Sequence, residues 1–172
     1  MKEQRVPGIL RIATKYGLIQ GVLSFVVFLV QTLAGITQDW VRTVASVAIL
    51  VVLMVLAHLE FRRTHNSEIT YAQGLGSGML LASVAALFTS VLIYVYAEYI
   101  NTGYIAAALH ARQLAFAQRG LTDAQVQRAM AVTGLFMSPV GIAISYLIAA
   151  VIVGFIAALI VSIFTQKGPR AL

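Results

Sequence analysis

Long uncharged, apolar stretches alternate with short charged segments along the whole chain. Four stretches contain no Asp, Glu, Lys or Arg, and they cover residues 16–38, 43–59, 69–97 and 129–166. About 20 apolar residues cross the hydrocarbon core of a bilayer, and a charge at its centre is costly. The pattern therefore predicts an all-α integral membrane protein with four transmembrane helices.

The bounds of the spans follow from local signals inside these stretches. The last stretch is too long for one span, and Ser138-Pro139 divides it. Serine is a favoured N-cap residue and proline is tolerated in the first turn, so a helix is expected to begin at Pro139. The third stretch begins as a polar loop before Gly74. We expect one transmembrane domain over residues 1–172, with spans at about 16–36, 42–60, 74–97 and 139–164.

The connection between the third and fourth spans, residues 102–137, carries helix signals of its own. Thr122 and Gln125 have the spacing of a capping box, in which two side chains satisfy the first free backbone N–H groups of a helix. Upstream, residues 105–118 are rich in alanine and precede Gly120, a residue type common just after a helix ends. The sequence predicts a helical hairpin here.

Composition and charge support the membrane assignment and predict an orientation. The chain is 60% hydrophobic and 10% charged, whereas soluble domains average about 45–50% apolar and about 25% charged residues. Lys and Arg concentrate on the cytoplasmic side of membrane proteins. Eight of them flank one side of the expected spans and four the other, which predicts cytoplasmic termini and an extra-cytoplasmic connection 102–137. The net charge of +6 therefore requires no nucleic acid as a partner.

Small residues recur every four positions on the expected spans, the pattern that lets membrane helices approach closely. The longest row is on the third span, a second row is on the fourth, and two glycines one turn apart lie on the first. A local pattern shared by the first and third spans also suggests that these two helices approach each other closely near their cytoplasmic ends. The candidate packing residues are Gly17 and Gly21; Gly74, Gly78, Ala82, Ala86 and Ser90; and Ala150, Gly154 and Ala158.

Polar side chains inside the spans are few, and each has two interpretations. Gln20 and Gln31, with Ser24, share one face of the first helix, where they bond other helices or form a small polar ligand pocket. His58 and Glu60 are expected to form an interfacial pair, with a proton site as the alternative. Glu98 lies among tyrosines, which is typical of an aromatic belt with an anchoring carboxylate.

The sequence lacks the patterns of the common enzyme and cofactor sites. It contains no cysteine, no His, Asp and Glu group with metal-ligand spacing, and no glycine-rich phosphate loop after a strand. Serines in the spans have no histidine base nearby in the sequence. We therefore expect a protein that is not an enzyme and that binds no cofactor or metal.

Three segments together resemble one protein family. They are residues 15–21 (KYGLIQG), 58–74 (HLEFR, then ITY and Gly74) and 120–139, from GLTDAQV to FMSP. The chain resembles the small bacterial four-helix membrane proteins of the domain of unknown function 4199 family. The resemblance implies the four-span architecture and a bacterial inner membrane, and it implies no activity.

These features favour an accessory or scaffold subunit that packs against a larger membrane complex or against itself. Its partners would be the lipid bilayer, other membrane subunits or a second copy. Val126 and Met130, one turn apart in the 102–137 connection, are the candidate contact residues, either against the outer end of the bundle or against a second protein. The alternative is a small oligomeric carrier or channel for a small solute, with a pathway lined by Gln20, Ser24, Gln31 and Tyr146.

Overall fold

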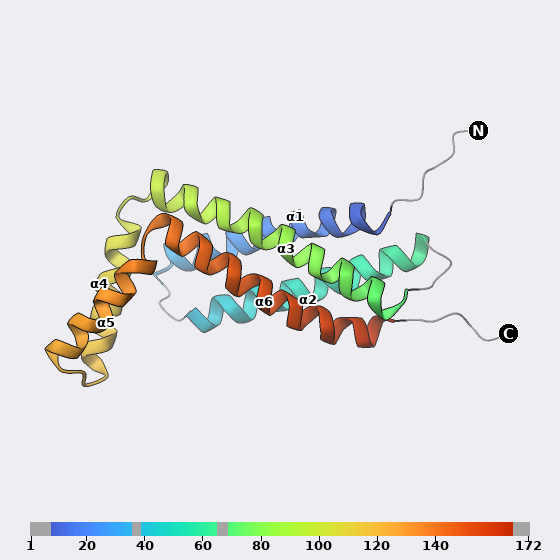
Figure 1. The fold of residues 1–172 in the computed structure, drawn as a ribbon. Helices are drawn as coiled ribbons and strands as arrows, with labels where there is room; N and C mark the ends of the chain where they lie inside the picture. Colours follow the sequence, from blue (N-terminus) through green and yellow to red (C-terminus); the bar gives the residue numbers. More distant parts are fainter. Residues whose placement is uncertain (1–7, 36–38, 65–68, 167–172) are drawn as a thin grey trace. The chain divides into compact units, whose positions relative to one another are not determined.

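The structure is a computed structural model, and it describes residues 8–35, 39–64 and 69–166. Every element in these residues is helical (Figure 1). In chain order they are α1 (Ile9–Leu33), α2 (Asp39–Thr64), α3 (Tyr71–Val95), the π-helical turn η1 (Tyr96–Ile100), α4 (Tyr104–Gln118), α5 (Asp123–Phe136) and α6 (Pro139–Thr165).

Four helices are long and apolar enough to cross a membrane: α1, α2, α3 with η1, and α6. The expected all-α class with four spans is therefore confirmed. The helices reach beyond the expected spans, since α1 begins at Ile9 and α2 ends at Thr64. The reason is that a charge marks the edge of the hydrocarbon rather than the end of a helix. A 25-residue helix is about 37 Å long, which exceeds the hydrocarbon thickness of about 30 Å.

The start of α6 follows the local chemistry of Ser138 and Pro139. The helix begins at Pro139, whose missing N–H costs nothing in the first turn. The Ser138 hydroxyl accepts a hydrogen bond from the Gly141 backbone N–H at 2.9 Å. The expectation that a helix begins at Pro139 is confirmed.

The chain groups into two compact units, with the divisions after Thr89 and after Ile148. In the first unit, α1 and the early part of α3 run in one direction, and α2 and the late part of α6 run in the other (Figure 1). The start of α1, the end of α2, the start of α3 and the end of α6 therefore lie at the same end of this bundle. Its core contains Ile12, Ala13, Leu50, Met54, Ala57, Phe61, Ile69, Leu81, Ala82, Ala157, Ala158 and Val161.

The second unit contains α4 and α5, which contact each other. Gly120 makes the turn between them with a φ of +76°, a conformation that glycine adopts at little cost. The Thr122 backbone N–H donates to Gln125 Oε1 at 2.9 Å, and a capping box begins α5, as expected. Helix α4 has no buried residue. In this connection, the structure therefore contains two helices that pack against each other.

Candidate functional site

The small-residue row on α3 lies directly against the row on α6. A Cβ atom built at Gly78 would lie 2.9 Å from Ala158 Cβ, and one built at Gly74 would lie 3.1 Å from Ser162 Oγ. A Cβ atom built at Gly154 would overlap the methyl group of Ala82. The two helices are antiparallel, so the α6 partner moves back four residues as the α3 residue moves forward four. We call this contact the α3–α6 seam; it pairs Gly74 with Ser162, Gly78 with Ala158, and Ala82 with Gly154.

Helix α1 packs against α3 along a second line of close contacts, the α1–α3 seam. A Cβ atom at Gly17 would lie 2.8 Å from the Leu81 carbonyl oxygen, and one at Gly21 would lie 3.2 Å from the Ala85 carbonyl oxygen. The Thr89 hydroxyl donates to the Gly21 carbonyl oxygen at 3.0 Å. Helices α1 and α3 therefore approach each other closely, well inside α3 rather than at its start.

The remaining members of the rows continue the same faces of α3 and α6, beyond the pair of Ala82 and Gly154. Ala86 and Ser90 are buried on α3, and Ala150 is half-buried on α6. Extending the register of the α3–α6 seam by one turn sets Ala86 opposite Ala150. The glycine pairs of the first and third spans do not face each other, because Gly74 and Gly78 are turned toward α6 instead.

The polar face of α1 is turned into the bundle. Gln20, Ser24 and Gln31 are all buried. Gln20 Nε2 lies 3.0 Å from Ser24 Oγ and 3.1 Å from the Ser46 carbonyl oxygen of α2, so this amide bonds α1 to α2. In the described part of the chain, Gln20 Oε1 has no hydrogen-bond partner.

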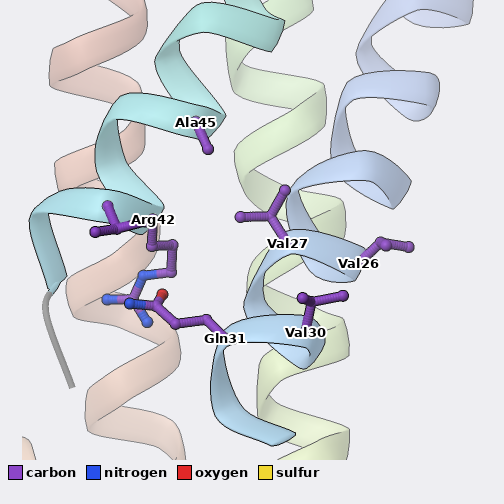
Figure 2. A pocket seen from close by; sticks show the side chains of 7 residues that line it. Val26, Val27, Val30, Gln31, Arg42 and Ala45 are labelled. Carbon is purple, nitrogen blue, oxygen red and sulfur yellow. The ribbon is translucent and has the colours of Figure 1, made fainter. Parts of the chain in front are cut away.

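A pocket of about 190 Å³ lies between α1 and α2. Figure 2 shows the side chains of Gln31 and Arg42, which extend from the two helices into the same space. The other lining residues are apolar: Val26, Val27, Val30, Val41 and Ala45. Gln20 and Ser24 do not line this pocket, and Tyr146 belongs to the other compact unit.

His58 and Glu60 do not form the expected interfacial pair. His58 is only 1% exposed, and its ring nitrogens lie 2.7 Å from Thr165 Oγ1 and 3.1 Å from the Gly74 carbonyl oxygen. That expectation is wrong because position 58 lies on the buried face of α2, one turn beyond Met54. The imidazole therefore connects three helices: α2, α3 and α6.

Glu60 connects α2 to the start of α1 instead. Its carboxylate accepts hydrogen bonds from Lys15 Nζ at 2.6 and 2.9 Å and from the Tyr16 hydroxyl at 2.7 Å. Lys15 Nζ also lies 4.8 Å from the centre of the Tyr16 ring. We did not anticipate this cluster from sequence, although antiparallel neighbouring spans bring the start of one and the end of the next to the same side.

The remaining candidate residues lie in the second unit. Glu98 is exposed in η1. On α5, Val126 is buried and Met130 is half-buried. Different apolar side chains are exposed on α4 and α5, and the periodicity of the sequence did not indicate them. They are Leu114, Val132 and Phe136.

The described residues bring together hydrogen-bonding groups rather than a ligand set for a metal. Among them, no cluster of three His, Cys, Asp or Glu side chains is placed to hold an ion. The two clusters that the structure assembles are His58 with Thr165 and Gly74, and Glu60 with Lys15 and Tyr16. Both join helices at the same end of the bundle.

Residues 15–167 match the family described as "Protein of unknown function (DUF4199)". The match covers most of the chain, so the chain belongs to this family, and the resemblance noted in the sequence is confirmed. No curated protein and no solved structure matches the chain.

Proposed function

We propose that this member of the family is an accessory or scaffold subunit of the bacterial inner membrane, which packs against a larger membrane complex or a second copy. The observation that carries the proposal is the α4–α5 pair. These helices have 15 and 14 residues, and Val126 is the one buried side chain among those described in them. The proposal assigns the chain no catalytic step.

Short helices need packing to persist. Isolated helices of fewer than about 12–15 residues are marginal in water, and most helical stability in proteins comes from tertiary contacts. The α4–α5 pair exposes Leu114 by 50% and Val132 by 59%. A second protein that covers these side chains would supply packing for the pair. A bilayer surface is the competing partner for the same side chains.

The orientation that we propose places both termini in the cytoplasm and the α4–α5 pair outside. Its support is the distribution of positive charge, since the end of the bundle where α1 begins carries Arg11, Lys15, Arg62 and Arg63. Positively charged residues near the ends of spans favour the cytoplasmic side. With four spans, the segment between the third and fourth then lies on the opposite side.

Single cysteines test this orientation, because the natural chain contains none. With Gln118→Cys, an impermeant thiol reagent should label the protein in intact cells, and with Ser67→Cys it should label only after the membrane is opened. Ser67 lies outside the described residues, in the segment between α2 and α3. Labelling of Ser67→Cys alone in intact cells would reverse the topology.

The assembly role is tested on the exposed apolar residues of the α4–α5 pair. The double variant Leu114→Ser and Val132→Ser should release the partner, or split a homo-oligomer, in native mass spectrometry of the detergent-extracted protein. The matched control, Gln113→Ser with Gln127→Ser, changes exposed polar positions on the same helices and should leave the assembly intact. Val126→Ser should instead weaken the fold, because Val126 is buried.

Two results would contradict the proposal. A wild-type protein that is extracted only as a monomer, under conditions gentle enough to retain lipids, has no partner to release. Equally, an assembly that survives the double variant unchanged does not use this surface.

The pocket between α1 and α2 favours one second candidate, a small oligomeric carrier or channel. Gln31 and Arg42 supply polar groups at an otherwise apolar pocket within the membrane-spanning helices. Polar groups that face a cavity between membrane-spanning helices commonly mark a solute pathway. This candidate predicts solute flux in proteoliposomes that Arg42→Met abolishes, whereas the subunit proposal predicts none.

A further inference from the structure

His58 is a titratable side chain enclosed by three membrane-spanning helices. It is 1% exposed, and both of its ring nitrogens have partners on other helices. A polar group at such a position is costly unless its hydrogen bonds are satisfied. The identity of the two partners therefore decides which forms of the ring the site can hold.

The partner of Nε2 requires a hydrogen on that nitrogen. Nε2 lies 3.1 Å from the Gly74 carbonyl oxygen, and a carbonyl oxygen only accepts hydrogen bonds. The same oxygen accepts from the Ser77 hydroxyl at 2.9 Å, which holds it in place. Nε2 consequently donates to Gly74 whether the ring is neutral or charged.

The partner of Nδ1 can form a hydrogen bond with that nitrogen whether or not it carries a hydrogen. Thr165 Oγ1 lies 2.7 Å from Nδ1 and 2.9 Å from the Val161 carbonyl oxygen. A hydroxyl both donates and accepts. When Nδ1 has no hydrogen, Thr165 donates to it. When Nδ1 carries a hydrogen, Thr165 accepts from it and donates to Val161 instead.

From this geometry we propose that His58 is a proton-binding site inside the bundle. A proton from water binds Nδ1, and the Thr165 hydroxyl rotates from Nδ1 to the Val161 carbonyl. The proton returns to water when the ring is neutralised, and no other bond forms or breaks. The heavy atoms of His58, Thr165 and Val161 keep their positions in both states.

The groups that face His58 supply hydrogen bonds rather than a counter-ion. Helices α3 and α6 contain no Asp, Glu, Lys or Arg, and their titratable residues are tyrosines. The nearest charged residues along α2 are Glu60 and Arg62, and Glu60 is bound to Lys15 and Tyr16 of α1. Ser162, whose hydroxyl is buried and has no partner in the described structure, lies beside Gly74. A charged ring would be held only by its hydrogen bonds to Thr165 and Gly74.

The site also explains why position 74 is glycine. A Cβ atom there would lie 3.1 Å from Ser162 Oγ and 3.5 Å from His58 Cε1. The absence of a side chain lets the ring of α2 and the serine of α6 both reach the α3 backbone. Proton binding at His58 thus takes place at the contact among three helices, at one end of the bundle.

The test is ¹⁵N NMR of the histidine ring in lipid nanodiscs across about pH 4–8, a range that brackets the usual histidine titration. The chain has three histidines, so His65→Gln and His110→Gln leave His58 as the sole signal. At high pH the ring should carry its hydrogen on Nε2, and at low pH on both nitrogens. A ring that stays in one form over the whole range, or that carries its hydrogen on Nδ1 at high pH, would overturn the proposal.

Thr165→Val tests whether the Thr165 hydroxyl stabilises the protonated ring. Valine keeps the shape of threonine but removes the hydroxyl that accepts from Nδ1. Hydrogen bonds to charged groups are about twice as strong as neutral ones, so the protonation midpoint should fall by about one pH unit. Thr165→Ser keeps a hydroxyl and should titrate like the natural chain. An unchanged midpoint in Thr165→Val would show that the Thr165 hydroxyl does not accept a hydrogen bond from the protonated ring.

Discussion

Replacing Gly17 with alanine should destabilise the bundle by about 2–3 kcal/mol, since overpacking a tight contact costs about 1–3 kcal/mol or more. The new Cβ atom would lie 2.8 Å from the Leu81 carbonyl oxygen and 2.9 Å from Val84 Cβ. A backbone oxygen cannot rotate away as the end of a flexible side chain can, so α1 and α3 must separate. The measurement is the free energy of unfolding in mixed detergent micelles.

The matched control is Gly76→Ala on α3. A Cβ atom at Gly76 meets nothing within 4 Å, and the residue is exposed in the second turn of α3. Alanine is a better helix former than glycine by up to about 1 kcal/mol, so this variant should be as stable as the natural chain or more so. Equal losses in Gly17→Ala and Gly76→Ala would show that the α1–α3 seam does not depend on close approach.

The second large effect is expected for Gly154→Ala on α6. Its new methyl group would meet the methyl group of Ala82 head-on. Ala82 is 4% exposed and belongs to the core, so its methyl group has no free space to enter. We expect a loss of about 1–3 kcal/mol in the same unfolding measurement. A stability equal to that of the natural chain would mean that α6 does not approach α3 at this point.

Much of the fold is readable from the sequence because its signals are local. Pro139 begins a helix through its own geometry, and the Thr122 and Gln125 side chains cap α5 within one turn. The four-residue spacing of small residues on α3 and α6 is also visible in the sequence. The pairing of the two rows is not, because register depends on how the helices slide past each other.

His58 shows why the site was harder to predict. Helix α2 is apolar around most of its circumference, so hydrophobic periodicity, the usual guide to the buried face, is weak there. The buried positions Leu50, Met54, Ala57 and Phe61 recur at helical spacing, and His58 shares their face. The clearest sequence cue for His58 was its place in the chain, near charged Glu60, and this cue led to the wrong interpretation.

The α4–α5 pair shows a different limit of prediction from sequence. The sequence indicates an amphipathic α5, but amphipathicity alone does not say what its apolar face contacts. In the structure Val126 is buried while Val132 is exposed by 59%. Experiments on a partner surface are therefore better directed at Val132 and Leu114 than at Val126.

The central claim is that α3 and α6 are held by pairs of small residues in one register, and exchanging one pair tests it most directly. Gly154→Ala alone should be destabilised, whereas Gly154→Ala combined with Ala82→Gly restores one methyl group and one hydrogen at the contact. We expect the double variant to recover most of the lost stability, which corresponds to a coupling free energy of about 1–2 kcal/mol in a double-mutant cycle. If the two effects simply add, so that the double variant is less stable than Gly154→Ala alone, residues 82 and 154 do not touch and the proposed register of the seam is wrong.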